Sequence, residues 1–285
     1  MANIPFCKMS GSGNDFIIID NRSGMWDQMK TPAFVKAVCR EKLSVGADGL
    51  IFIEKSDAAD FKWHFFNSDG SQAEMCGNGA RCAARFAYLK GIAGDRLSFE
   101  TVAGMIHAEV RGAVVKTQLS QPKNLQMNQE LTVDGARLTV HSINTGVPHA
   151  VIFVDDLAAV PIKELGAKIR FHAHFQPVGT NVNFISIGAD GSIGIRTYER
   201  GVEAETLACG TGSVAAALVC IAMGRAASPA LVKTRGGELL NVYAEPASPP
   251  FAQAYLEGGA SLVYTGEMCE EAYTSQQAGR LKANS

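Results

Sequence analysis

Two cysteines stand at the start of two similar glycine-rich turns. Residues 75–82 read MCGNGARC and residues 208–213 read ACGTGS, and each stretch runs into a segment of helical composition. A thiol in the first turn of a helix lies beside backbone N–H groups and the positive end of the helix dipole, which lower its pKa. The glycines leave these N–H groups uncovered, so the same turn can hold a carboxylate. Cys76 and Cys209 are therefore candidates for proton transfer at a carbon next to a carboxylate.

The two motifs belong to a longer internal repeat. Cys76 aligns with Cys209 at an offset of 133, and the same offset aligns residues 13, 45–46, 77, 79, 83–84, 101 and 104 with identical residues further along. One unbroken register over five separated segments predicts two homologous halves. We expect an N-terminal half of residues 1–120, joined by the tail 266–285, and a C-terminal half of residues 121–265. Residues 121–128, which show no periodicity, are the predicted linker.

Two halves that each place one cysteine at a helix start suggest a site with near-mirror chemistry. One sulfur would remove a proton from a carbon, and the other would deliver a proton to the opposite face. That is the chemistry of a two-base racemase or epimerase, in which the helix N-termini stabilise the charge that develops on the carboxylate. The alternative is structural: two glycine-capped core helices that happen to begin with Cys.

The surrounding pattern predicts the elements that position these residues. Short apolar strands separated by tight glycine turns, as at Gly104 and Gly112, indicate a largely antiparallel sheet. Residues 213–223 contain no charged side chain, and a helix that is apolar all round must be covered on all sides. We therefore predict an α+β fold of two pseudo-symmetric domains, each a mostly antiparallel sheet wrapped around a central apolar helix.

Composition excludes several classes of protein. The chain has 285 residues, 47% apolar and 19% charged, which is typical of a soluble protein of two domains. A net charge of −2 without a basic run argues against nucleic-acid binding. The sequence shows no secretory signal and no apolar segment long enough to span a bilayer, so we expect a cytoplasmic protein without a membrane partner. Seven cysteines without CxxC spacing predict neither a zinc site nor a disulfide scaffold.

Five motifs together resemble the diaminopimelate epimerase family. They are SGSGNDF (10–16), FNSDGS (66–71), MCGNGARC (75–82), YERG (198–201) and ETLACGTG (205–212), in the family's order over about residues 6–265. The resemblance implies a homodimeric isomerase that converts LL- to meso-diaminopimelate for lysine and peptidoglycan-precursor biosynthesis. It also implies that one thiolate and one thiol act on this small amino acid without pyridoxal phosphate, metal or any other cofactor.

The resemblance further assigns residues to roles. Cys76 and Cys209 are the implied proton-transfer pair, with His149 and Glu199 beside them to set thiol protonation. Arg200 suits bidentate capture of the distal carboxylate. The implied substrate-binding positions are Asn14, Asn67, Gly77, Asn78, Asn181, Glu199, Arg200, Gly210 and Thr211. Asp48 also matches a motif position, and formation of a turn explains it equally well.

Two positions depart from the family pattern. Val147 stands where the family often has Asn, and Gly49 stands where some members have Gln. Both changes bear on recognition of the distal end of the substrate, and both leave the two cysteine motifs intact.

Three other functions are compatible with parts of the pattern. A cofactor-independent racemase of proline, hydroxyproline or histidine would share the paired cysteines, but the proline type has His where Asn78 stands. Asn78 and Arg200 therefore favour diaminopimelate. A redox thiol switch would instead use Cys76 and Cys209 as a disulfide pair, and a phosphate-binding protein would use only the glycine turns. Catalysed exchange of an α-proton distinguishes the epimerase from these last two.

Overall fold

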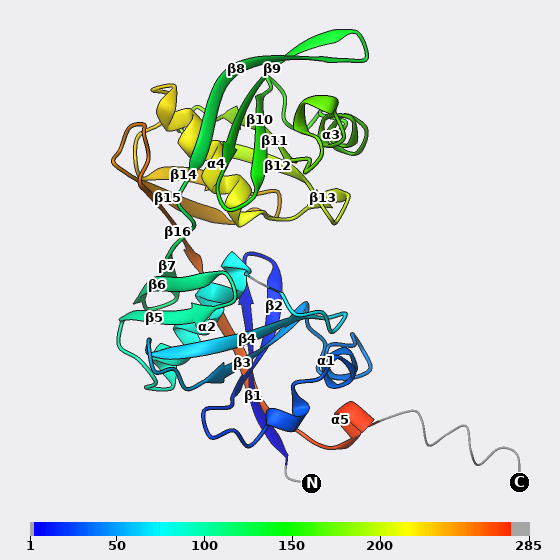
Figure 1. Ribbon diagram of the computed structural model, residues 1–285, viewed down its shortest axis with the longest axis vertical. Helices are drawn as coiled ribbons and strands as arrows, with labels where there is room; N and C mark the ends of the chain where they lie inside the picture. Colours follow the sequence, from blue (N-terminus) through cyan, green and yellow to red (C-terminus); the bar gives the residue numbers. More distant parts are fainter. Residues whose placement is uncertain (1–2, 74, 275–285) are drawn as a thin grey trace, which may run out of the picture. The chain divides into compact units, whose positions relative to one another are not determined.

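A computed structural model describes residues 3–73 and 75–274 of the chain (Figure 1). Its residues form two compact units. Unit 1 contains the described residues up to Val115 together with those from Gly259 to Thr274, and unit 2 contains Lys116–Gly258. The chain thus changes unit five residues before the first predicted boundary and seven before the second. The second difference arises because β17 (Ser261–Met268) pairs with β1 (Ile4–Gly11) in unit 1. Of the predicted tail 266–285, residues 275–285 lie outside the described part.

Unit 1 is a mixed sheet dominated by antiparallel neighbours. Its further strands are β2 (Asn14–Asp20), β3 (Gly49–Glu54), β4 (Phe61–Asn67), β5 (Arg96–Thr101), β6 (Gly104–Arg111) and the start of β7 (Val114–Gln118). Pairs β17–β1, β1–β2, β3–β4 and β5–β6 are antiparallel, and pairs β2–β3 and β4–β5 are parallel. Its helices are η1 (Asp27–Met29), α1 (Pro32–Val38), α2 (Gly77–Leu89) and α5 (Glu271–Thr274).

The sheet of unit 1 has a helix on each face, which explains why β2 is apolar throughout. Phe16 and Ile18 pack with the core around α2, and Ile17 and Ile19 pack with the core around α1. A strand covered on both sides loses the alternation of apolar and polar residues that marks a half-exposed strand. The helix α2 begins directly after Cys76, so the packing of this helix against the sheet sets the position of the thiol.

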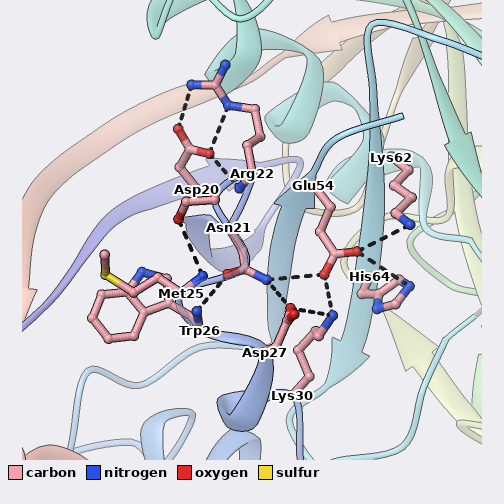
Figure 2. Close-up of polar contacts among 11 residues, drawn as sticks. Asp20, Asn21, Arg22, Met25, Trp26, Asp27, Lys30, Glu54, Lys62 and His64 are labelled. Carbon is pink, nitrogen blue, oxygen red and sulfur yellow. Dashed lines mark hydrogen bonds and ion pairs between the residues drawn. The ribbon is translucent and has the colours of Figure 1, made fainter. Parts of the chain in front are cut away.

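A polar cluster in unit 1 ties the loop after β2 to the end of β3 (Figure 2). The buried carboxylate of Glu54 accepts hydrogen bonds from Lys30 Nζ at 2.5 Å and Asn21 Nδ2 at 3.2 Å. Burial alone would raise the pKa of Glu54, but the Lys30 hydrogen bond and the nearby cations outweigh it and lower the pKa. Asn21 also donates to Asp27 at 2.9 Å and accepts from the Trp26 N–H at 2.8 Å. The cluster is internally satisfied and holds the chain that leads into α1.

Unit 2 repeats this plan. Its strands are β8 (Lys123–Val133), β9 (Ala136–Asn144), β10 (Pro148–Phe153), β11 (Asn181–Ile187), β12 (Ile193–Glu199), β13 (Ala204–Thr206), β14 (Ala230–Lys233), β15 (Leu239–Glu245) and β16 (Gln253–Gly259). Pairs β10–β11 and β12–β14 are parallel, and pairs β8–β9, β9–β10, β11–β12, β12–β13, β14–β15 and β15–β16 are antiparallel. The helices are α3 (Ile162–Arg170), η2 (Ala173–Phe175) and α4 (Gly210–Ala222).

The helix α4 lies at the centre of unit 2 and is covered on all sides. Every residue from Gly212 to Ile221 is buried, and strands β9 to β12, β14 and β15 contact the helix. The helix α3 packs against a second core on Ile152 and Phe184. The prediction of a mostly antiparallel sheet around a central apolar helix in each half is confirmed. No helix within the described residues is long and apolar enough to cross a membrane.

The predicted linker at residues 121–128 is wrong, because most of it belongs to β8. Asn124 and Asn128 have φ values of +54°, and the pairing of β8 with β9 shifts register between Lys123 and Gln126 and again between Gln126 and Gln129. Such irregularities insert residues that break the period of two in the side chains. Half of the strand is also exposed, so its polar composition resembles that of a loop.

The internal repeat is real in the fold, but its register is not unbroken. In unit 1, Phe16 of β2 pairs with Gly49 of β3, and in unit 2, His149 of β10 pairs with Asn181 of β11. The equivalent strands β2 and β10 are therefore 133 residues apart in the sequence, whereas β3 and β11 are 132 residues apart. The next strands, β4 and β12, keep the offset of 132, and the helices α2 and α4 return to 133. Unit 2 therefore has one residue fewer between β10 and β11 than unit 1 has between β2 and β3. This shift of one position changes which side chains are equivalent in the strands that pack against α2 and α4.

Candidate active site

The first candidate half-site forms where α2 begins. Cys76 is the N-cap residue, with extended backbone angles of φ −144° and ψ 120°, and its carbonyl accepts the first helical hydrogen bond from Ala80 N at 2.8 Å. The N–H groups of the first turn of α2 have no acceptor within the helix, as at every helix start. A Cβ atom added at Gly77 would meet nothing within 4 Å, so the glycine leaves this turn open. The predicted positions Cys76 and Gly77 thus lie together at one helix N-terminus.

A directed chain of hydrogen bonds orients the two predicted amides of this half. Arg81, whose side chain is 0% exposed, donates to Asn78 Oδ1 at 3.0 Å. Asn78 Nδ2 donates to Asn14 Oδ1 at 2.8 Å, and Asn14 Nδ2 donates to Asp48 Oδ2 at 2.9 Å. A cation at one end and a carboxylate at the other leave each amide only one orientation that satisfies its neighbours. The structure brings Asn14 and Asn78 together as predicted positions, with Asp48 as their anionic anchor.

Asn67 joins this half less directly. It ends β4 with an exposed side chain, whose Nδ2 donates to Ser71 Oγ at 3.0 Å. The next residue, Ser68, donates its N–H to the Asp48 carbonyl at 2.9 Å. Asp48 therefore both forms the turn and positions polar groups from two strands.

The second candidate half-site forms where α4 begins. Cys209 is the N-cap residue with φ −122° and ψ 109°, and it is 9% exposed. Its carbonyl accepts from Ser213 N at 2.9 Å and from Ser213 Oγ at 3.0 Å. Its sulfur lies 3.6 Å from Thr211 Oγ1. Cys209, Gly210 and Thr211 thus form one helix N-terminus, as the sequence predicts.

His149 reaches this terminus from β10. Its Nε2 lies 3.0 Å from Thr211 Oγ1, and its Nδ1 lies 3.1 Å from Asn183 Nδ2. The ring is 1% exposed, and this burial, helped by the charge of Arg200 and opposed by the Asn183 hydrogen bond, lowers the pKa of His149 to about 3. The imidazole is therefore neutral at physiological pH. Its hydrogen-bonded path to the Cys209 sulfur runs through Thr211.

Arg200 and Asn181 form a second predicted group in this half. The Asn181 side chain accepts from the Arg200 N–H at 2.8 Å and donates to the Pro148 carbonyl at 3.2 Å. The Arg200 guanidinium donates to the Val178 carbonyl at 3.1 Å. These contacts hold a guanidinium at the end of β12, from where its charge acts on His149.

Glu199 is the last residue of β12. Its carboxyl is half-buried, and this burial raises its pKa, while the Thr206 hydroxyl opposes the shift. A carboxyl with a raised pKa suits a group that exchanges protons near neutral pH.

The two departures from the family pattern differ in physical character. A Cβ atom at Gly49 would lie 2.6 Å from Phe65 Cε2 and 2.8 Å from the Phe66 carbonyl oxygen, so this strand position has no room for a side chain. Val147 is half-buried, and its carbonyl accepts from Thr145 N at 3.2 Å.

Several residues that orient the site were not among those predicted from the sequence. Arg81 on α2, Asn183 on β11 and Thr197 on β12 are buried polar residues, and each donates to a predicted site residue or to its partner. The available signal was their polarity within apolar segments, since a buried polar group requires a hydrogen-bond partner. Among residues 3–73 and 75–274, no group of three or more His, Cys, Asp or Glu side chains is arranged to hold a metal ion.

The fold is shared with isomerases and their structural relatives. A Bacillus anthracis phenazine biosynthesis protein of the PhzF family matches with a TM-score of 0.71 at 16% identity, over 94% of this chain and 100% of that one. A hydroxyproline epimerase from Agrobacterium vitis, with bound trans-4-OH-L-proline, matches with a TM-score of 0.66 at 14% identity, over 94% and 93%. These matches show that this chain shares its fold with a PhzF-family protein and with a hydroxyproline epimerase.

Sequence comparison makes the assignment specific. The sequence model described as diaminopimelate epimerase matches residues 6–122 and 141–263. The diaminopimelate epimerase of Aquifex aeolicus is 48% identical over 277 residues, which cover 93% of this chain and 98% of that protein. This chain belongs to the diaminopimelate epimerase family and is an isomerase.

Proposed function

We propose that this chain interconverts LL- and meso-diaminopimelate by transfer of the α-proton between two cysteines. The observation that supports it best is the equivalence of Cys76 and Cys209, each the N-cap of a buried helix whose first turn begins with glycine. Membership of the family supports the choice of substrate over proline, hydroxyproline or histidine, and over a redox or phosphate-binding role.

The reaction requires one cysteine as thiolate and the other as thiol. The thiolate takes the α-proton and becomes a thiol, while the electron pair left on carbon is delocalised into the α-carboxylate. The second thiol then delivers its proton to the opposite face of the carbon and becomes the thiolate. Backbone N–H groups of Gly77, Asn78, Gly210 and Thr211 would hold the carboxylate and stabilise the added charge.

The remaining predicted residues take supporting roles in this proposal. Asn14, Asn67, Asn181 and Arg200 would bind the distal amino acid group, with the Arg200 guanidinium suited to the distal carboxylate. His149 and Glu199 would adjust the protonation of the thiols. No cofactor takes part in these steps.

We also propose a cytoplasmic homodimer. An odd set of seven cysteines without CxxC spacing is typical of small buried thiols in a reducing compartment. Strand β17 exposes the apolar side chains of Leu262, Val263 and Tyr264, and apolar side chains exposed in this way can be covered by a second copy. Sedimentation of the purified chain tests the dimer, and a single monomeric species would contradict it.

The function is tested by incubating the reduced protein with LL-diaminopimelate in D₂O. We expect deuterium at the α-carbon and formation of the meso isomer, and a loss of about a hundredfold or more in Cys76→Ala and in Cys209→Ala. Cys82→Ala on α2 and Cys220→Ala on α4 are matched controls, because both thiols are buried in the same two helices, and both variants should epimerise. Exchange with proline or histidine but not with diaminopimelate would assign a different substrate. Normal inversion in either Cys76→Ala or Cys209→Ala would contradict the mechanism.

A further inference from the structure

A buried asparagine on β11 fixes the hydrogen bonds beneath Cys209. Asn183 is fully buried, and its Nδ2 lies 2.9 Å from the Ala150 carbonyl oxygen and 3.1 Å from His149 Nδ1. Its Oδ1 accepts from the Thr197 hydroxyl at 2.9 Å. A backbone carbonyl can only accept, so the amide must place its NH₂ group, and not its oxygen, toward Ala150. The second hydrogen of the same NH₂ group then points at His149.

The orientation of this amide decides which nitrogen of His149 bears the proton. Because Asn183 donates to Nδ1, that nitrogen must be the unprotonated acceptor. The neutral ring therefore has its proton on Nε2 and donates it to Thr211 Oγ1, 3.0 Å away. Thr211 accepts this bond, and its own hydroxyl proton can point to the Cys209 sulfur at 3.6 Å.

We propose that Asn183 is a positioning residue that holds His149 as the Nε2–H tautomer and, through the Thr211 hydroxyl, directs a hydrogen-bond donor at Cys209. The chain of donors runs in one direction, from Thr197 to Asn183, His149, Thr211 and the sulfur. A donor aimed at sulfur stabilises the thiolate relative to the thiol, so the chain favours the charged form of Cys209. This inference rests on the proposed function for its catalytic meaning, but not for its chemistry.

The first turn of α4 packs tightly against the Asn183 amide. A Cβ atom at Gly212 would lie 2.4 Å from Asn183 Oδ1 and 3.2 Å from the Cys209 sulfur, so only glycine lets the helix start approach the amide. The titratable and charged groups that face His149 are few. Arg200 at the end of β12 acts on it through its charge, Glu199 precedes Arg200, and the first turn of α4 contains no acidic residue.

The corresponding positions in unit 1 show that the fold does not require this chain. By the paired strand registers, His149, Asn183 and Thr197 correspond to Phe16, Ile51 and Phe65. Those three residues are buried in the core that covers α2. An apolar trio thus supports one cysteine-capped helix, and a polar trio supports the other.

The first test observes the tautomer directly in the unaltered protein. The ¹⁵N spectrum of histidine-labelled protein near neutral pH, with His149 identified by its loss in His149→Gln, should show Nε2 protonated and Nδ1 unprotonated. A protonated Nδ1 would overturn the proposal, and this measurement needs no variant of Asn183.

The second test measures the reactivity of Cys209 without substrate. Iodoacetamide modification of the peptide containing Cys209 is followed by mass spectrometry as a function of pH, in a Cys76→Ser background. In Asn183→Leu we expect the pH midpoint to rise and the rate near pH 7 to fall about tenfold, the effect of losing one hydrogen bond to a charged group. Thr211→Val should slow the modification of Cys209 similarly. Thr211→Ser, which keeps the hydroxyl, should react at the rate of the parent protein.

Ile185→Ala provides the matched control. Ile185 is buried two positions further along β11 and packs in the core around α4, so its truncation destabilises the same strand without touching the donor chain. We expect a lower melting temperature and an unchanged pH midpoint for Cys209. An unchanged midpoint in folded Asn183→Leu, or an equal shift in Ile185→Ala, would overturn the proposal. Since alkylation is independent of turnover, a failure of the epimerisation assay is recognised separately.

Discussion

The two cysteine-capped helices share a backbone and differ in the side chains around it. A Cβ atom at Gly79 of α2 would lie 3.4 Å from both Ile51 and Phe16, which is ordinary van der Waals contact. A Cβ atom at the equivalent Gly212 of α4 would lie 2.4 Å from the Asn183 amide oxygen. The backbone thus supplies the same thiol position and the same N–H groups twice, and the residues beneath decide how each thiol is tuned.

The buried polar side chains that orient the helix starts lie on the helix in unit 1 and on the strands in unit 2. In unit 1, buried Arg81 on α2 orients Asn78. The residue equivalent to Arg81 on α4 is Val214, which is also buried, and in unit 2 the polarity comes from the strands through His149 and Asn183. Duplication therefore preserved the helix start, while the means of orienting its polar neighbours differ.

The largest expected effect is a loss of stability in acid that comes from His149 in unit 2, since its counterpart in unit 1, Phe16, cannot be protonated. Because the pKa of His149 falls from 6.5 to about 3 on folding, the unfolded chain takes up a proton between these values that the folded chain does not. This contribution to stability is complete above pH 6.5 and is lost progressively as the pH falls toward 3. The free energy of unfolding should drop by several kcal/mol more in the wild type than in His149→Gln. Urea unfolding of both proteins at pH 7 and pH 4 measures this difference, and parallel pH dependences would contradict it.

An intermediate effect is expected when a methyl group is added to each glycine in turn. Gly212→Ala should lower the free energy of unfolding by about 1–3 kcal/mol, because the Asn183 amide must move. Gly79→Ala should be neutral or stabilise by up to about 1 kcal/mol, since alanine fits this contact and favours the helix. Urea midpoints compare the two variants, and equal destabilisation would remove the structural contrast between the halves.

The smallest expected effect concerns the amide chain of unit 1. Asn14→Asp replaces a donor to Asp48 by a second carboxylate, so we expect a loss of about 1 kcal/mol at pH 7, limited by the exposure of Asp48. Asn14→Asp combined with Asp48→Asn restores one donor and one acceptor and serves as the control. A single variant as stable as the wild type at pH 7 would show that the Asn14–Asp48 bond contributes nothing.

Local sequence features were sufficient to predict the family, the central helices and the helix-start cysteines. Glycine after Cys76 and Cys209 and the apolar run after Gly212 act within one helix, so their meaning is readable from neighbouring residues. The same local reasoning failed for β8, whose register shifts and exposed face remove the alternation that identifies a strand.

The sequence by itself determined which residues could do chemistry at each helix start, because cysteine and glycine have that meaning wherever a helix begins. Only the tertiary structure decided that Asn183 and Thr197 stand beneath Cys209 while Ile51 and Phe65 stand beneath α2. That difference depends on a one-residue change of offset between paired strands, which places different side chains at equivalent positions. Strand register is set by contacts between distant segments, so it follows from packing of the whole sheet and not from any one stretch of the chain.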